Sequence, residues 1–183
     1  MQEARELEYF TYDDYVKKEG RWELINGEFW DMSPAPTSKH QWIAQMIWRE
    51  IEENLTCKKR CKTFISPIDW VVDKYTIIQP DVAIFCIKEF VKNFTNPPLM
   101  AVEVLSKSSA LKDRNIKFKI YEQNGVKYLL FVEPNSEFCG VFELLKDKYQ
   151  LIDTLFYKDS KEFSFKNCKT KIDFSNVFEK IDE

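Results

Sequence analysis

Glycine and histidine are both scarce in this chain of 183 residues, which contains four glycines and one histidine. Loops that cradle phosphate groups need several closely spaced glycines, so these isolated ones exclude a P-loop and a dinucleotide-binding fingerprint. A Ser-His-Asp or Cys-His mechanism would have to use the single histidine, His40, and no Gly-x-Ser-x-Gly turn accompanies it. The common nucleotide-binding loops and hydrolase triads are therefore excluded.

Long hydrophobic runs are also missing. Apolar stretches such as residues 128–132 are too short to cross a bilayer, so we expect no contact with a membrane. The N-terminal residues are rich in acids and do not resemble a signal peptide. Five cysteines, an odd number without a secretory signal, predict reduced thiols and a cytoplasmic location. With one histidine available, we expect no structural zinc site at Cys57 and Cys61.

The chain has no excess of basic residues, since 27 lysines and arginines stand against 30 acids and the net charge is −3. Proteins that bind nucleic acids usually have such an excess, so contact with DNA must come from a local patch. Basic residues gather at 58–62 and at 107–119, whereas the first 31 residues are mainly acidic. Basic segments beside an acidic site suit a DNA nuclease, although charge runs are more often solvated faces.

The composition is that of a globular protein, with 44% hydrophobic and 15% aromatic residues. The length fits one domain spanning residues 1–183. Periodicity predicts helices at 11–18, 38–55, 110–124 and near 174–180, and strands at 63–72, 76–86, 99–105 and 127–132. Hairpins are expected at 21–32, around Asn26-Gly27, and within 137–183. A strand–helix–strand unit at 99–132 implies a parallel pair, so we predict an α/β fold with a mixed sheet flanked by helices.

Two carboxylates interrupt apolar strands. Asp81 follows Pro80 in one strand, and Glu103 lies within the sequence LMAVEVL. Burying a carboxylate costs several kcal/mol unless a metal or another partner compensates it. If the two strands are neighbours, both side chains can converge on one Mg²⁺, which prefers oxygen ligands. The alternative is two unrelated acids at strand ends, each exposed or paired with a cation.

Glu23, Lys117 and His40 are weaker candidates. Glu23 shares a strand face with Ile25, so it is either buried with Ile25 or part of a solvated hairpin face. On a helical wheel Lys117 falls in the inward arc with Ile120 and Tyr121, where it is either a catalytic ammonium or a snorkelling surface lysine. His40, at the N-terminal end of its helix, is more often a hydrogen-bonded residue than a catalyst, and it can also contact a phosphate.

Several short segments, in this order and spacing, resemble the Uma-two family of predicted restriction endonucleases, within the PD-(D/E)xK nuclease superfamily. They are ELINGE at 23–28, MSPAPTSKHQ at 32–41, QPDVAIF at 79–85, VEVLS at 102–106, YLLFVEP at 128–134, and the residues Asp113, Lys117, Tyr121 and Gly125. The similarity covers about residues 8–145.

The resemblance implies a restriction-endonuclease-like fold and a metal-dependent nuclease. It makes Asp81 and Glu103 the metal-binding acids, with the Val104 carbonyl as a further ligand. The lysine expected two residues after the second acid is replaced by Leu105, and Lys117 matches a lysine that has migrated to the following helix. Glu23 matches an acid of the family's first motif.

The leading hypothesis is hydrolysis of DNA phosphodiester bonds with Mg²⁺, or Mn²⁺ in its place. Asp81, Glu103, Lys117 and Glu23 would be catalytic, and the residues expected to contact the substrate are His40, Tyr121, Lys107 and Arg114. Cutting both strands of a duplex would favour a homodimer. Leu105 motivates a second hypothesis, an inactive nuclease-fold module that binds DNA or a protein. A third is an enzyme acting on another nucleic acid.

Overall fold

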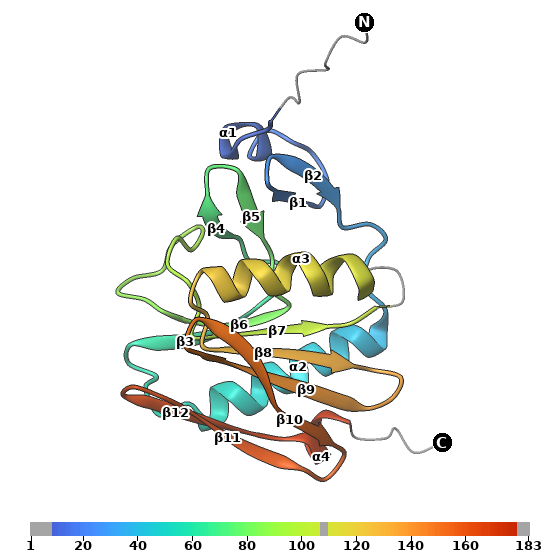
Figure 1. Cartoon of the computed structure of the whole chain (residues 1–183), viewed down its shortest axis with the longest axis vertical. Helices are drawn as coiled ribbons and strands as arrows, with labels where there is room; N and C mark the ends of the chain where they lie inside the picture. Colours follow the sequence, from blue (N-terminus) through green and yellow to red (C-terminus); the bar gives the residue numbers. More distant parts are fainter. Residues whose placement is uncertain (1–8, 107–109, 179–183) are drawn as a thin grey trace, which may run out of the picture.

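The computed structural model describes residues 9–106 and 110–178, without the side chains of residues 110–114. The described residues form three sheets and four helices, arranged as in Figure 1. The helices are α1 (Tyr12–Tyr15), α2 (Ser38–Asn54), α3 (Ala110–Gln123) and α4 (Phe174–Val177). The strands are β1 (Trp22–Ile25), β2 (Glu28–Asp31), β3 (Cys61–Ile65), β4 (Trp70–Asp73), β5 (Thr76–Ile78), β6 (Val82–Cys86), β7 (Met100–Val104), β8 (Tyr128–Glu133), β9 (Phe138–Leu145), β10 (Lys148–Phe156), β11 (Ser160–Phe165) and β12 (Cys168–Asp173).

The largest sheet has the strand order β10-β9-β8-β7-β6-β3. Its centre is the predicted strand–helix–strand unit, in which β7 and β8 run parallel and α3 is the crossover. The other neighbouring strands of this sheet are antiparallel. All five residues of β7 are buried, because helices cover both faces of the sheet there. The predicted mixed sheet is therefore present.

The two long helices lie on opposite faces of this sheet, with α3 in front of it and α2 behind it in Figure 1. The stripe of Ile43, Ile47 and Ile51 on α2 packs against even-numbered residues of β7, such as Val102. The α2 helix begins after Thr37, whose hydroxyl accepts a hydrogen bond from the His40 N–H. The α3 helix packs on the odd-numbered residues, such as Ala101. This alternation turns Glu103 towards α3.

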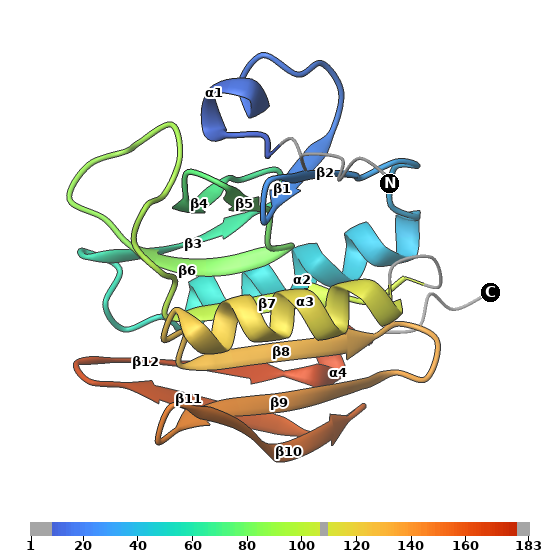
Figure 2. The ribbon, with the colours of Figure 1, turned by 45° about the horizontal axis from the view of Figure 1, so that its top comes forward.

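A smaller sheet has the order β2-β1-β5-β4 and lies beyond the β6–β3 end of the large one (Figure 2). Its β1–β2 hairpin is the predicted one, and both turn residues, Asn26 and Gly27, have positive φ, at 52° and 80°. The single strands predicted at 63–72 and 76–86 are wrong. Each is divided between the two sheets, and each division falls at a proline, Pro67 or Pro80, which has no N–H for a ladder hydrogen bond.

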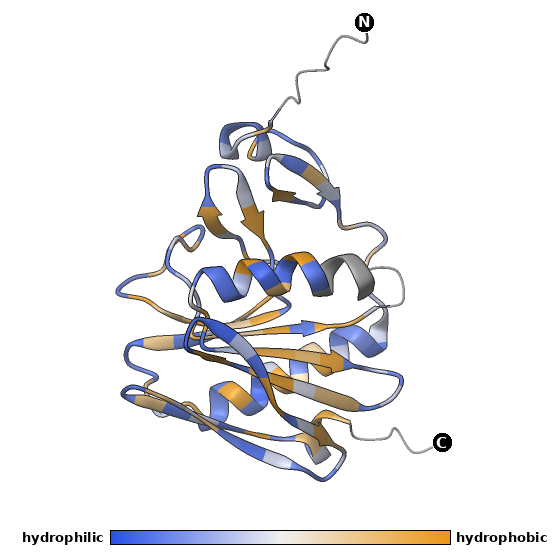
Figure 3. Cartoon of the chain, viewed as in Figure 1, coloured by the Kyte–Doolittle hydropathy of each residue, from blue (hydrophilic) through white to orange (hydrophobic). Residues whose placement is uncertain are grey.

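The C-terminal part adds the β11–β12 hairpin and α4, which pack against α2. Phe163 and Ile172 of the hairpin are fully buried in the core beneath α2. Figure 3 shows the central strands as mainly hydrophobic, whereas the C-terminal hairpin carries more hydrophilic residues. The alternating burial along β12 agrees, since only one of its faces meets the core.

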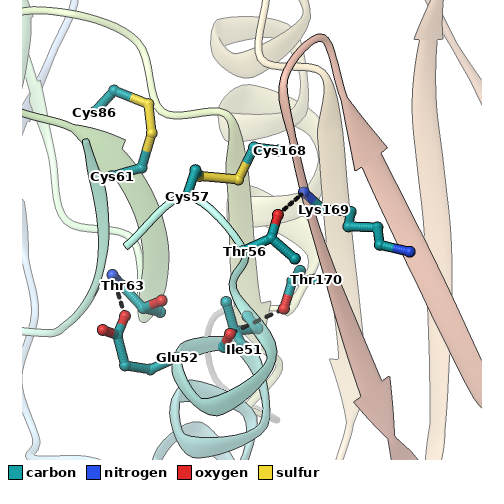
Figure 4. The surroundings of a disulfide bond; sticks show 10 residues. All are labelled: Ile51, Glu52, Thr56, Cys57, Cys61, Thr63, Cys86, Cys168, Lys169 and Thr170. Atoms are coloured by element: carbon teal, nitrogen blue, oxygen red, sulfur yellow. Dashed lines mark hydrogen bonds between the residues drawn. A yellow bond between two sulfur atoms is a disulfide. The ribbon is translucent and has the colours of Figure 1, made fainter. Parts of the chain in front are cut away.

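The prediction of reduced cysteines is wrong for four of the five. Cys61 and Cys86 face each other across β3 and β6 and form one disulfide, while Cys57 is joined to Cys168 at the start of β12 (Figure 4). The remaining thiol, Cys139, is buried, and burial raises its pKa. Counting cysteines could not reveal these pairs, since 111 residues separate Cys57 from Cys168 and only the tertiary structure brings them together.

Among the residues that the structure describes, no helix is both long enough and apolar enough to cross a bilayer.

Candidate active site

The two acids predicted on neighbouring strands are indeed neighbours. In the antiparallel β6–β7 pair Val82 lies opposite Val102, so extending this register by one residue places Asp81 opposite Glu103. Ala83, which shares a face with Asp81, packs in the cluster beneath α3, as does Ala101, which shares a face with Glu103. Both carboxylates therefore stand on the α3 side of the sheet, at the end of β6 and near the end of β7.

Lys117 reaches this pair from α3. Its side chain is only 3% exposed, and its Nζ lies 3.2 and 3.3 Å from the two carboxylate oxygens of Glu103. The same nitrogen lies 2.8 Å from Glu23 Oε1. The helical wheel had left open whether this lysine snorkels to water, and the structure buries it between two acids.

Leu105 stands where the sequence motif would have placed a lysine. It directly follows β7 and is buried in the cluster beneath α3, the helix that Glu103 faces. The ammonium of Lys117 arrives at Glu103 from the helix that covers this face. An ammonium from the following helix thus lies beside Glu103, at the position to which the family resemblance assigned Lys117.

Tyr121, one helical turn beyond Lys117, completes the surroundings of Glu103. Its hydroxyl donates a hydrogen bond of 2.6 Å to Glu103 Oε1, and its ring lies against that of Trp70, with centroids 5.7 Å apart. Burial raises the pKa of the Glu103 carboxyl, opposed by the Lys117 charge and assisted by the charges of Asp81 and Glu23. Burial, together with the neighbouring Glu103, raises the pKa of Tyr121 well above its usual range.

Glu23 comes from the smaller sheet and is buried, so the reading as a solvated hairpin face is wrong. Strand β1 pairs with β5, with Leu24 opposite Ile77, which brings Glu23 to the end of β5. There its Oε1 accepts a 2.7 Å hydrogen bond from the Gln79 N–H, and the Gln79 carbonyl lies 3.4 Å from Lys117 Nζ. The early hairpin therefore contributes an acid to the centre of the site.

Asp81 and His40 form the outer part of the site. Asp81 Oδ2 accepts a 2.8 Å hydrogen bond from the Val104 N–H and lies 3.3 Å from His40 Nε2. Burial acts to lower the pKa of His40, but the hydrogen bond and charge of Asp81, helped by the Val104 backbone, outweigh it and raise that pKa. The side chains of His40 and Asp81 are 12% and 19% exposed, so this end of the site opens towards solvent.

A hydrogen-bonded triad behind Gln79 was not predicted from the sequence. The side-chain amide of Gln79 donates a hydrogen bond of 2.9 Å to Asp69 Oδ1 and one of 3.2 Å to the Tyr15 hydroxyl. The Tyr15 hydroxyl in turn donates a hydrogen bond of 2.8 Å to the same Asp69 oxygen. Tyr15 and Gln79 are 64 residues apart, so no local periodicity relates them. The one available signal was a polar residue, Gln79, directly before the Pro-Asp pair.

Two further residues, Lys107 and Arg114, were predicted to contact the substrate. Lys107 lies outside the described residues, and of Arg114 only the backbone, which belongs to α3, is described. Of the two basic segments, 58–62 follows α2 next to the disulfides, whereas part of 107–119 forms α3.

The oxygen donors suit a hard divalent cation in their chemistry. Asp81 and Glu103 carry carboxylates close enough for the charge of one to raise the pKa of the other, and a cation would relieve this repulsion. The Val104 carbonyl belongs to the residue whose N–H binds Asp81. As they stand in residues 9–106 and 110–178, no three side chains of His, Cys, Asp or Glu converge closely enough to hold a metal ion.

The fold matches a solved structure titled "Crystal structure of a putative nuclease belonging to DUF820 from Anabaena variabilis". The TM-score is 0.73 at 15% sequence identity, and the match covers 92% of this chain and 97% of the other. The predicted restriction-endonuclease-like fold is confirmed. A search of the curated proteins finds no match. A family model, Uma2, described as "Putative restriction endonuclease", matches residues 6–164, and the chain therefore belongs to the Uma2 family of nuclease-like proteins.

Proposed function

We propose that residues 1–183 form a metal-dependent endonuclease domain that hydrolyses phosphodiester bonds in DNA. The observation that carries the proposal is the buried cluster in which Lys117 joins Glu103 and Glu23, with Asp81 across the strand pair. Burying three charged side chains costs free energy that an apolar core would not. Perturbed titratable groups gathered in this way are typical of catalytic sites.

In this proposal Asp81, Glu103 and the Val104 carbonyl would hold Mg²⁺, and Mn²⁺ could replace it. The bound cation supplies Lewis acidity, which lowers the pKa of a water molecule and neutralises charge on the phosphate. Lys117 stabilises negative charge that develops on the attacking or phosphate oxygen.

The remaining residues orient this centre or contact the substrate. Glu23 positions Lys117, since it lies 2.8 Å from the ammonium, and Tyr121 fixes the carboxylate of Glu103. His40, at the more open end, contacts the substrate phosphate together with Lys107 and Arg114.

The test is cleavage of supercoiled and single-stranded DNA in Mg²⁺ or Mn²⁺, with EDTA as the metal-free control. We expect Asp81→Ala and Glu103→Gln to abolish cleavage while the circular dichroism spectrum is unchanged. Lys169→Ala, on the remote C-terminal hairpin, removes a cation that is 55% exposed and should cleave as the wild type does. Cleavage at the wild-type rate by either acid variant would contradict the assignment of that acid to the metal site.

A second candidate is a module that binds DNA or a protein partner without cleaving it. It is favoured by the charge balance within the site, where the Lys117 ammonium contacts and partly neutralises both Glu23 and Glu103. This candidate predicts DNA binding that needs no metal and no cleavage under any of the conditions above.

A further inference from the structure

A cavity with a mixed polar and apolar lining lies beside the candidate active site, on the side of α1 and the β1–β2 hairpin. Its volume is about 360 Å³, within the range of ~300–1,000 Å³ found for small-molecule sites. Gln79 forms part of its wall, so one residue belongs to both the cavity and the active site. None of the roles proposed above uses this cavity.

Three cations line the cavity, whereas only one acid, Asp69, does so. Lys18, Arg21 and Lys92 form no ion pair within the described part of the chain, and Lys18 lies 4.3 Å above the ring of Trp22. In a chain with a net charge of −3, a local excess of positive charge without paired acids favours an anionic ligand. Arginine and lysine are the side chains that bind phosphate groups.

Aromatic side chains form another part of the wall. Two of them, Tyr12 and Tyr15, are fixed at their hydroxyl ends. The Tyr12 hydroxyl accepts a hydrogen bond from Asn93 Nδ2, 2.6 Å away, and the Tyr15 hydroxyl is held by Asp69. Trp22 supplies a third ring. Rings held in this way can stack on a nucleobase without further ordering, which is how proteins bind unpaired bases.

The cavity and the proposed catalytic centre share Gln79. Gln79 binds Glu23 through its N–H and Lys117 through its carbonyl, and Asp81 is two residues further on, at most roughly 7 Å along an extended chain.

We propose that the cavity holds one unpaired nucleotide of the substrate strand, next to the phosphate that is cleaved. Its base lies against the aromatic wall, and its phosphate lies against Arg21 and Lys92. A base in a regular duplex is stacked on both faces, so it can enter such a cavity only from a single strand or after flipping out. The inference rests on the proposed nuclease function and makes single-stranded or locally opened DNA the preferred substrate class.

The test is equilibrium binding, followed by fluorescence anisotropy, of a labelled single-stranded DNA and of its duplex in EDTA, where no metal-dependent cleavage occurs. We expect the single strand to bind more tightly than the duplex. Arg21→Ala/Lys92→Ala should weaken single-strand binding by about 10-fold or more and remove the preference, since two phosphate contacts are lost. Trp22→Ala should weaken it by about 5-fold or more through lost stacking.

The matched control is Lys169→Ala/Lys171→Ala, which removes the same charge from two exposed positions of β12 on the remote C-terminal hairpin. It should bind within about 2-fold of the wild type, because these cations are outside the cavity. Equal losses of single-strand affinity in the two double variants would overturn the nucleotide site in the cavity, because the loss would then depend on net charge alone. Urea unfolding of each variant shows that the compared proteins are folded.

The outcomes separate this inference from the proposed function. In one outcome the wild type cleaves DNA but binds both DNA forms equally, and Arg21→Ala/Lys92→Ala has no effect on binding. This outcome overturns the nucleotide site in the cavity and leaves the proposed nuclease function intact. A wild type that prefers the single strand and loses this preference in that variant, but does not cleave DNA in either Mg²⁺ or Mn²⁺, leaves the cavity as the site of a binding module. That result overturns the proposed hydrolysis of DNA.

Discussion

The two faces of strand β7 are buried in different ways. Its even-numbered residues, such as Val102, lie in an apolar core under α2, and the Cys57–Cys168 disulfide links the end of that helix to the C-terminal hairpin. On the opposite face Glu103 forms a buried network with Lys117 and Tyr121 beneath α3. One strand of five residues thus separates a face built for stability from a face that buries charge.

This difference indicates which face of the sheet can carry a reactive site. Hydrophobic burial and a disulfide stabilise the α2 face without constraining the charges on the other side. The α3 face includes ions whose desolvation opposes their mutual attraction, so it contributes less to stability than an apolar core of the same size. Strain and buried charge at functional sites are commonly offset by stable packing elsewhere in a protein.

The largest effect is expected from the disulfide on the α2 face. Cys57→Ser/Cys168→Ser should lower the free energy of unfolding by about 4 to 5 kcal/mol, because the bond closes a long loop in the unfolded chain. Cys61→Ser/Cys86→Ser, which opens a loop of 25 residues, should cost about 3.5 kcal/mol. Urea unfolding measures both, and cleavage by the folded variants should persist because the α3 face is unchanged.

A thiol titration sharpens this first prediction. The unfolded, unreduced chain should show one free thiol, that of Cys139, since the other four cysteines are paired. Five titratable thiols would contradict the disulfides, and the two double variants would then differ little from the wild type in stability.

The next largest effect should come from the ammonium on the α3 face. Lys117→Met leaves two buried carboxylates without their cation and should cost about 3 to 5 kcal/mol in the free energy of unfolding, together with loss of cleavage. Lys127→Met removes a lysine that is 41% exposed and 3.7 Å from Glu143, so it should cost less than about 1 kcal/mol.

A double variant tests whether the unpaired charge causes this loss. Lys117→Met/Glu103→Gln removes both the ammonium and the carboxylate that it contacts, so it should be more stable than Lys117→Met alone. Equal stability of the single and double variants would mean that the lost packing of the lysine stem, rather than the buried charge, dominates.

The smallest of these effects is expected from the hydroxyl that donates to Glu103. Tyr121→Phe should cost roughly 1.5 to 3 kcal/mol, because a fully buried hydrogen bond to a carboxylate is lost, and it should slow cleavage. Tyr149→Phe removes a 2.7 Å hydrogen bond to the neutral Val126 carbonyl, so it should cost about 1 kcal/mol and leave cleavage unchanged. A fall in cleavage rate of the same size in both variants would argue against a role of Tyr121 in the site.

Much of the site could be predicted because its residues break local patterns. Glu103 interrupts an apolar strand, Asp81 follows a proline in another, and Lys117 falls in the inward arc of a helix. Each of these signals arises from periodicity over a few residues. Glu23 was ambiguous for the same reason, since a four-residue strand in a hairpin does not reveal which of its faces another element covers.

The features that were missed all depend on long-range contacts. Two predicted strands are in fact divided between the sheets at Pro67 and Pro80, because consecutive segments pair with different neighbours. The hydrogen bonds from Gln79 to Tyr15 and Asp69 form only when α1 packs beside the end of β5. The cavity next to Gln79 depends on the same arrangement.

The sequence by itself determined the central strand–helix–strand unit, the early hairpin and the identity of the acids and the lysine, because these follow from short-range periodicity and turn chemistry. Only the tertiary structure decided that Glu23 is buried beside Lys117, that four cysteines are paired, and that a basic and aromatic cavity adjoins Gln79. The physical reason is that burial and pairing are properties of packed elements, and the strand order that packs them is not encoded in any local segment.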